Sequence, residues 1–231
     1  DQIRIFSHIL GGLSIPARSI ESIQFSREVL TTWGRILVCD RSGVQEVDRS
    51  GKVHWTFKKN VQFAWAAVRL DTGNILIAAT NFNQVMEVNV KGDVVWRLNG
   101  VSYPYDVDRL PNGNTLVAEY TGNQVSEFNL QGKRVWSCTK INRPTSVQRL
   151  ENGYTLIGSE TGVIEVDPEG KQVWKAPLNR VRPLRARRLE NGNTLICDQR
   201  RGQVVEIERS GKEVWKKTGL GRPMSALRME N

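Results

Sequence analysis

Aromatic and basic residues recur at corresponding places ahead of five similar Arg-Leu or Arg-Met pairs. The position seven residues before the Leu or Met holds Phe63, Tyr103, Arg143, Arg182 and Arg222. Five residues before it stand Trp65, Tyr105, Thr145, Leu184 and Met224, and the position four before it includes Asp106 and Arg185. Aromatic faces stack on rings, and Arg forks onto carboxylate or phosphate. These residues predict a site for a ligand with planar or sugar rings and negative charge. The alternative is structural: the aromatic side chains fill the wall of a central channel, and a nearby Pro in four copies sets the conformation of the loop that enters the strand.

Positive charge gathers in the last third of the chain. The 231 residues carry a net charge of +9, and residues 180–217 hold eleven Lys or Arg against five acids. Four arginines in this segment lie outside any repeated pattern: Arg185, Arg187, Arg200 and Arg201. They are candidates for a basic patch that binds phosphate or sulfate, and a solvated basic face is the alternative. An anionic partner is favoured over a cationic one.

The composition argues against several kinds of chemistry. Only His8 and His54 are present, so a multi-histidine metal site is excluded. Cys39, Cys138 and Cys197 form no CxxC pair and are expected to be buried thiols. No Gly-rich phosphate loop follows a strand pattern, and the acids Asp40, Glu119 and Asp198 are expected to cap loops through backbone N–H groups. We expect no catalytic residue, no metal and no cofactor.

A period of about 40 residues organises the chain. The segments 110–117, 150–157 and 189–196 are near copies of Leu-x-Asn-Gly-x-Thr-Leu-Val/Ile, and 70–77 is a fourth. The glycines Gly34, Gly73, Gly113, Gly153 and Gly192 are separated by 39, 40, 40 and 39 residues. A Gly-x-x-x-Trp marker runs in phase and ends at Trp55, Trp96, Trp136, Trp174 and Trp215. Such a fixed period indicates stacked units of supersecondary structure.

Each unit is typical of four short antiparallel strands joined by Gly-containing turns. Forty residues, four strands and no helical periodicity predict an all-β fold, a β-propeller of four-stranded blades. We place the blades at 16–55, 56–96, 97–136, 137–174 and 175–215 of a single domain. Residues 216–231 supply one more inner strand and residues 1–15 a closing strand, so a composite or incomplete sixth blade is expected. Five blades closed by strand exchange, or two complementing chains, are the alternatives.

Two further residues recur in every copy. Arg precedes the first-strand Leu or Met, at Arg69, Arg109, Arg149, Arg188 and Arg228, and the third strand carries Glu46, Glu87, Glu127, Glu165 and Glu206. Identical placement around a ring predicts Arg–Glu pairs that pin neighbouring strands or blades. The repeated Trp is expected to pack between adjacent sheets.

The unit formed by residues 109–119 and 123–136, RLPNGNTLVAE followed by NQVSEFNLQGKRVW, resembles the repeat of bacterial propellers related to the PQQ-binding (quinoprotein) and NHL-type families. The resemblance covers roughly residues 20–231 and implies the fold rather than an activity. Quinoprotein dehydrogenases usually have eight blades, a calcium site and an adjacent Cys pair, and this chain has fewer blades and no neighbouring cysteines. Arylsulfotransferase-like propellers share the Asn-Gly-Asn-Thr-Leu strand but use histidine chemistry, and neither histidine here falls on an inner strand.

These observations predict a non-catalytic binding scaffold that engages a protein, glycan or other anionic ligand at the channel mouth or on the 180–217 face. The alternatives are a quinoprotein-like or arylsulfotransferase-like enzyme module, an NHL-like propeller that binds nucleic acid, and a repeat fragment or engineered assembly without its own activity. The longest apolar run, Phe63 to Val68, is six residues, so no membrane span is expected. An oligomer or strand complementation between chains would close the ring.

Overall fold

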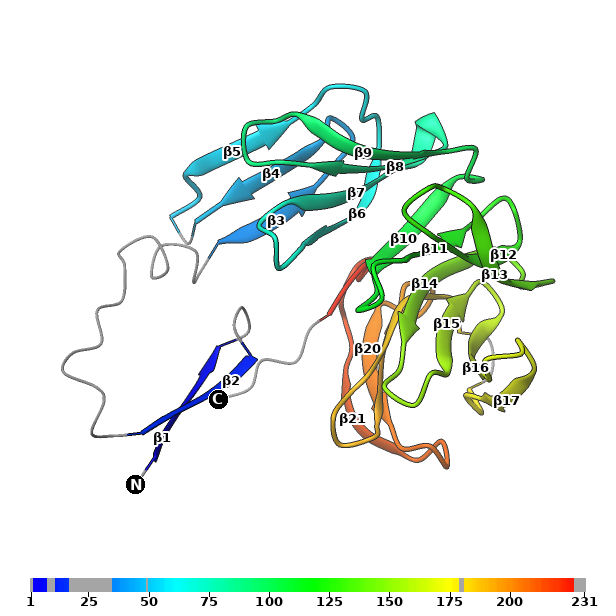
Figure 1. Ribbon diagram of the computed structural model, residues 1–231. Helices are drawn as coiled ribbons and strands as arrows, with labels where there is room; N and C mark the ends of the chain where they lie inside the picture. The colour runs from blue at the N-terminus through cyan, green and yellow to red at the C-terminus, as the bar shows by residue number, and fades with distance from the viewer. Residues whose placement is uncertain (1, 8–10, 17–34, 49, 179–180, 227–231) are drawn as a thin grey trace.

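The computed structural model describes residues 2–7, 11–16, 35–48, 50–178 and 181–226. Within these ranges the chain is built from short strands, with a single turn of 3-10 helix, η2 (Thr80–Phe82). The strands form a β-propeller of five blades, which follow one another along the chain (Figure 1). None of the described helical segments is long and apolar enough to cross a membrane.

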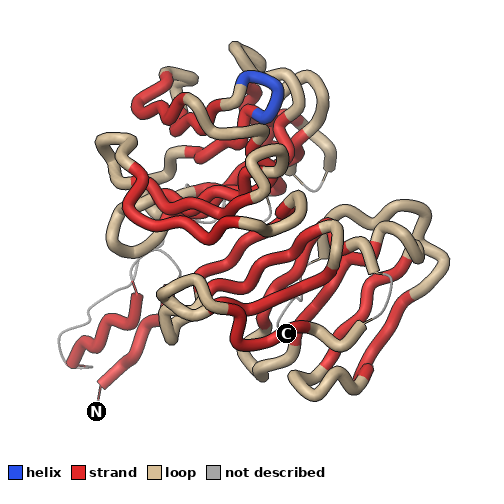
Figure 2. The backbone as a smooth tube through the Cα atoms, turned by 90° about the vertical axis from the view of Figure 1, so that its right-hand side faces the viewer, coloured by secondary structure: helices blue, strands red, loops and turns tan. Residues whose placement is uncertain are grey.

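Four blades have four antiparallel strands in sequence order. They are β6 (Ala64–Arg69), β7 (Ile75–Ala79), β8 (Gln84–Val88) and β9 (Val94–Asn99); then β10 (Pro104–Arg109), β11 (Thr115–Glu119), β12 (Gln124–Phe128) and β13 (Arg134–Thr139). The next two are β14 (Pro144–Arg149), β15 (Thr155–Ser159), β16 (Gly162–Val166) and β17 (Gln172–Lys175); then β18 (Pro183–Arg188), β19 (Thr194–Asp198), β20 (Gln203–Ile207) and β21 (Glu213–Lys217). This confirms the four-stranded blade predicted from the repeat, and Figure 2 shows how little of the path is helical.

The first blade shows three strands, β3 (Ile36–Cys39), β4 (Val44–Val47) and β5 (Val53–Phe57). The rest of its expected range, residues 17–34, lies outside the described residues. The residues expected to supply a closing strand contain β1 (Gln2–Ser7), which pairs with β2 (Gly11–Pro16) in a hairpin that stands apart from the blades in Figure 1. Residues 222–226, part of the expected sixth inner strand, form no strand and pair with no described strand, and residues 227–231 are not described.

The hydrophobic core lies between the blades rather than within any one of them. Ile75 and Ile77 pack with Val44 and Phe57 of the first blade, and similar clusters join each later pair of blades. A single four-stranded sheet cannot bury both faces, so each repeat becomes stable only against its neighbours. This dependence is why the sequence repeats at a fixed period.

The recurring Arg and Glu clamp one blade to the next, as predicted. Arg of each inner strand pairs with Glu of the preceding blade: Arg69–Glu46 at 2.5 Å, Arg109–Glu87 at 2.6 Å, Arg149–Glu127 at 2.6 Å and Arg188–Glu165 at 2.7 Å. In three of these pairs the guanidinium also lies 4.7–4.9 Å above the Trp of the preceding blade. Arg228, the fifth expected member, is outside the described residues.

The repeated Trp docks in the opposite direction. The indole Nε1 donates to a backbone carbonyl of the following blade: Trp96 to Leu130 at 2.7 Å, Trp136 to Pro168 at 2.6 Å and Trp174 to Arg209 at 2.8 Å. Trp and Arg therefore both serve the blade interfaces, which leaves the residues that differ among copies for a site.

Candidate functional site at the channel mouth

Two sets of loops meet at one end of the propeller. In each complete blade, the residue after the second strand donates its backbone N–H to the carbonyl of the residue seven before the repeated Leu. These bonds run from Thr80 to Phe63, from Tyr120 to Tyr103, from Glu160 to Arg143 and from Gln199 to Arg182, at 3.1–3.3 Å. Each bond holds the loop after a second strand beside the connection that leads into the inner strand. This pairing builds the rim of the channel mouth.

Three rim residues adopt the left-handed backbone conformation. Phe63, Tyr103 and Arg143 occupy the same place in successive blades, with φ of 59°, 56° and 49°. Asn side chains of the preceding blade accept the backbone N–H of two of them, Asn83 from Tyr103 at 2.9 Å and Asn123 from Arg143 at 3.0 Å. A left-handed conformation costs a residue with a Cβ about 1–2 kcal/mol, whereas Gly adopts it freely. Large side chains are thus held at the rim against a backbone cost.

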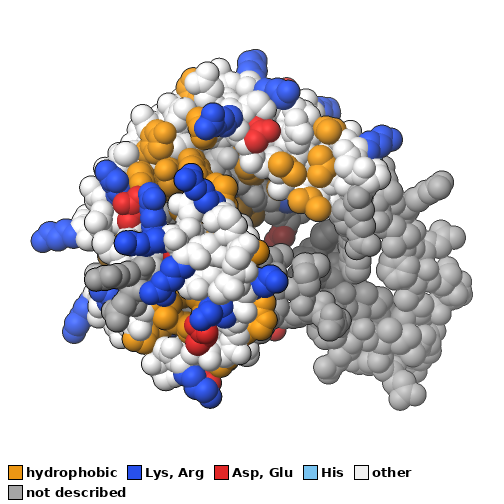
Figure 3. All heavy atoms as spheres, turned by 180° about the vertical axis from the view of Figure 1, so that it is seen from behind, with side chains coloured by type: hydrophobic (Ala, Val, Ile, Leu, Met, Phe, Trp, Pro, Cys, Tyr) orange, Lys and Arg blue, Asp and Glu red, His pale blue; other side chains and the backbone are white. Residues whose placement is uncertain are grey.

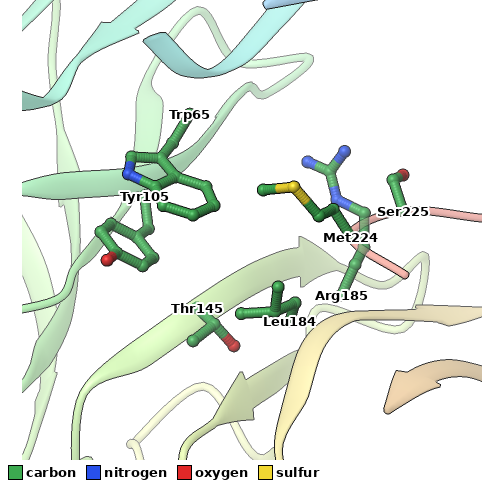
Figure 4. A pocket seen from close by; sticks show the side chains of 7 residues that line it. All are labelled: Trp65, Tyr105, Thr145, Leu184, Arg185, Met224 and Ser225. Atoms are coloured by element: carbon green, nitrogen blue, oxygen red, sulfur yellow. The ribbon is translucent and has the colours of Figure 1, made fainter. Parts of the chain in front are cut away.

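In the four complete blades, the residue five before the repeated Leu sits at a β-bulge: Trp65, Tyr105, Thr145 and Leu184. In four blades the register between the first two strands shifts at this residue, so it is left without a partner and its side chain is re-aimed. Trp65, Tyr105, Thr145, Leu184 and Met224 all line one cavity of about 70 Å³, with Arg185 and Ser225 (Figure 4). The five residues that occupy equivalent positions in the sequence copies therefore lie together in the structure.

Aromatic rings form a continuous stack on one side of the mouth. Trp65 and Tyr105 have ring centroids 4.5 Å apart and planes 22° apart, and Tyr105 stacks on Tyr120 at 4.0 Å and 13°. Tyr103 lies outside the stack, 6.4 Å from Tyr120 and tilted by 46°. Burial raises the pKa of both Tyr105 and Tyr120, so these phenols stay neutral at pH 7.

Glu160 joins the aromatic side of the mouth to the basic side. It accepts the Tyr120 hydroxyl at 2.5 Å, the Arg182 guanidinium at 2.6 Å and that of Arg143 at 3.4 Å. Arg143 also lies 5.5 Å above the Tyr120 ring. Partial burial would raise the pKa of Glu160, but the hydrogen bonds from Tyr120 and Arg182 outweigh burial and hold that pKa below its usual range. The carboxylate is therefore charged and fully engaged.

Sequence reasoning missed Tyr120 and Glu160. The available signal was their place directly after the second strand, next to Glu119 and Ser159, where the loops of successive copies also differ. The acids of that region do cap loops as expected. Asp198 accepts the backbone N–H groups of Arg182 and Arg200 at 3.1 Å, Glu119 accepts that of Ser102 at 2.9 Å, and Asp40 that of Ser42 at 2.6 Å.

Beyond Glu160 the rim becomes basic. A cavity of about 460 Å³ is lined by Arg182, Gln199, Arg200 and Arg222. All three arginines are exposed, and Arg182 lies beside the Tyr120 hydroxyl through its bond to Glu160. Basic side chains also outnumber acidic ones on the face seen in Figure 3. The cavity thus presents guanidinium groups and one amide to solvent.

Two arginines of the predicted sites, Arg185 and Arg187, turn inward. Arg185 forms a salt bridge with buried Asp106, and Arg187 lies 3.5 Å from the same carboxylate and donates to the Val147 carbonyl at 2.8 Å. The four-arginine patch is therefore divided: Arg185 and Arg187 serve the channel interior, while Arg200 and Arg201 stand on the rim. Arg185 and Arg187 lie two residues apart on the inner strand β18 and so share the face that meets Asp106, whereas Arg200 and Arg201 lie in the turn after β19.

Elements of histidine or metal chemistry do not gather at the mouth within the described part of the chain. His54 lies on β5, the outermost strand of the first blade, with Nε2 2.7 Å from Asp48. His8 is outside the described ranges. Among the described residues, no group of three or more His, Cys, Asp or Glu could hold a metal ion.

Solved structures share this architecture. A protein of unknown function from Bacteroides caccae is 24% identical, with a TM-score of 0.68 over 80% of this chain and 78% of that one. A streptogramin B lyase is 14% identical, with a TM-score of 0.65 over 83% of this chain and 67% of that one. Virginiamycin B lyase from Staphylococcus aureus is 13% identical, with a TM-score of 0.61 over 80% and 70%. At these identities the likeness shows the fold alone.

No curated protein matches the chain at a significant level. The family described as "Outer membrane protein assembly factor BamB", by contrast, matches residues 40–158 and 159–231. These two segments hold most of the five blades, including the Arg–Glu clamps and the docked tryptophans. The chain therefore belongs to this family of PQQ-like β-propellers.

Proposed function

We propose that this propeller is a non-catalytic binding module whose channel mouth takes an anionic partner. The observation that carries the proposal is the chain of contacts Tyr120–Glu160–Arg182, which couples the aromatic stack to the arginine-lined cavity. Arg182, Arg200 and Arg222 meet there, and none of the described residues that line the cavity carries a carboxylate. Guanidinium groups that converge on one cavity favour carboxylate, sulfate or phosphate, with which they form paired hydrogen bonds.

The other predicted basic residues are less available to an anionic partner, because acids of the chain already pair with them. Arg185 and Arg187 already neutralise Asp106, and Arg188 and Arg209 both pair with Glu165. Much of the positive charge in residues 180–217 is therefore matched by acids. At the channel mouth, by contrast, Arg182, Arg200 and Arg222 are exposed around one cavity.

Binding of poly-L-glutamate and heparin at 50 and 200 mM NaCl tests the proposal. The triple variant Arg182→Ala/Arg200→Ala/Arg222→Ala should bind both polyanions about 100-fold more weakly at low salt, because each exposed charge pair is worth up to about 1 kcal/mol and three of them correspond to about that factor. Wild-type affinity should also fall steeply with salt. Unchanged affinity in the triple variant would overturn the proposal.

A matched control removes three charges at the opposite end of the blades. Lys91, Lys133 and Lys171 are exposed in the turns between third and fourth strands. The triple variant Lys91→Ala/Lys133→Ala/Lys171→Ala lowers the net charge equally and should retain most of the binding. Equal losses in both triple variants would mean that net charge, and not the mouth, captures the polyanion.

A further inference from the structure

The backbone conformation of the left-handed rim residues is itself evidence about the site. At this position Gly would fit without strain, yet successive blades keep Phe63, Tyr103 and Arg143. Elsewhere the fold uses Gly freely: the connection into the third blade has Gly100 at φ 75° where the next connection has Lys140 at φ 64°. Strain held by a large side chain on the rim of the channel mouth points to a role for that side chain.

The aromatic stack limits what the ligand can be. Tyr105 has Trp65 on one face and Tyr120 on the other, so a flat aromatic ligand cannot enter the stack without separating these rings. Tyr103 is tilted away from the stack and is partly exposed. Outside the stack the rim carries the rings of Phe63, which Arg41 covers at 5.1 Å, and of Tyr103, so Tyr103 is the ring that remains next to Tyr120 for the apolar edge of a small ring.

The polar groups that line the cavity supply both donors and an acceptor. Arg182, Arg200 and Arg222 donate, while the Gln199 amide both donates through its nitrogen and accepts through its oxygen. The cavity has a volume of about 460 Å³, which suits a small molecule. A protein partner would instead need a contact surface of about 800 Å² on each side. Hydroxyl groups, an apolar ring edge and a negative group occur together in an acidic saccharide.

We propose that the mouth binds an acidic saccharide, with its ring against Tyr103 and its carboxylate or sulfate between Arg182, Arg200 and Arg222. This inference rests on the proposed function and narrows it to a ligand class. Tyr103 then selects for a sugar ring, and the arginines select for its charge. Neutral sugars lack the charge, and acidic peptides lack the ring edge.

Calorimetric titration of the full chain with four small probes tests the ligand class. The probes are trigalacturonate, a heparin-derived hexasaccharide, maltotriose and triglutamate. We expect at least one acidic saccharide to bind about tenfold or more tightly than both maltotriose and triglutamate. The two acidic saccharides separate a carboxylate from a sulfate as the charged group.

Variants at the rim connect this preference to the structure. Tyr103→Gly and Tyr103→Ala should each weaken the preferred saccharide about 5- to 10-fold while the unfolding midpoint stays within a few degrees. Lys140→Gly removes the backbone strain of a left-handed residue in the next connection, and Lys140 does not line the cavity. This variant should bind the preferred saccharide as tightly as the wild type.

Triglutamate binding as tightly as the saccharides would overturn the inference and leave the proposed function standing. Full saccharide affinity in Tyr103→Gly would also overturn it. If neither the acidic saccharides nor the polyanions bind, the proposed function fails with it.

Discussion

The Asp106 carboxylate on β10 and the Arg185 guanidinium on β18 form a salt bridge across the central channel, between blades that are not neighbours. Asp106 is fully buried and also accepts the backbone N–H of Val147 on β14, the inner strand between them, at 3.0 Å. One carboxylate thus holds three inner strands. It ties the channel together beneath the mouth and occupies two arginines that would otherwise attract anions.

Removal of this carboxylate should be costly. Asp106→Ala leaves Arg185 and Arg187 without their acid, and breaking a buried ion pair typically costs about 3–5 kcal/mol. We expect the free energy of unfolding, measured with urea, to fall by about 3 kcal/mol. The double variant Asp106→Ala/Arg185→Met should recover part of that loss. A loss below about 1 kcal/mol in the single variant would show that the bridge contributes little.

The clamp between the third and fourth blades should act as a coupled unit. Arg149 pairs with Glu127 at 2.6 Å and covers Trp136 at 4.9 Å. A double-mutant cycle of Arg149→Ala and Glu127→Ala should give a coupling energy of about 1–3 kcal/mol, because both side chains share one partly buried contact. Urea unfolding of the four proteins measures it. Additive losses would contradict a direct clamp.

Buried threonine hydroxyls offer a stabilising change. Thr115, Thr155 and Thr194 occupy one position in three blades, and their Oγ1 atoms are buried without a hydrogen-bond partner among the described residues. The second blade has Ile75 there, 1% exposed. Thr155→Val should raise the free energy of unfolding by about 1 kcal/mol, since it removes an unsatisfied polar group and keeps the shape. The matched reverse change, Ile75→Thr, should lower it.

The thiols should be unreactive in the folded protein. Cys197 is buried and Cys39 is only partly buried, short of the full burial expected for it; this burial raises the pKa of both thiols to about 11, although Arg185 acts against the shift. At pH 8 few of these thiols are thiolates, the form that reacts with alkylating reagents. Mass spectrometry after iodoacetamide treatment should find both unmodified in native protein and modified after unfolding in urea. Rapid native labelling at pH 8 would contradict the burial.

Glu160 should contribute to the loss of stability in acid. Its pKa is below the usual range in the folded state, so its contribution is present above the pKa of an unfolded Glu, near 4.3, and is lost as the pH falls through the folded pKa. Glu160→Gln should therefore show a shallower decline in the unfolding midpoint below about pH 4.5 than the wild type. Glu151→Gln, at an exposed position, is the control and should follow the wild type. Identical curves for Glu160→Gln and wild type would contradict the assignment.

The repeat by itself determined the blade, its four strands and the Arg–Glu and Trp contacts between blades, because a contact made identically at every interface leaves the same residue types in every copy. It also placed Trp65, Tyr105, Thr145, Leu184 and Met224 together, since equivalent positions around a ring face one channel. Only the tertiary structure decided the rest. The bridge from Asp106 to Arg185 spans 79 residues and skips a blade, so it has no counterpart in the repeat. The Tyr120–Glu160–Arg182 chain likewise comes from three different blades, and the strain at Tyr103 is a backbone property that residue types do not encode. The residues that depart from the repeat are those that distinguish the channel mouth, and their geometry depends on which surfaces the packing of the blades brings together.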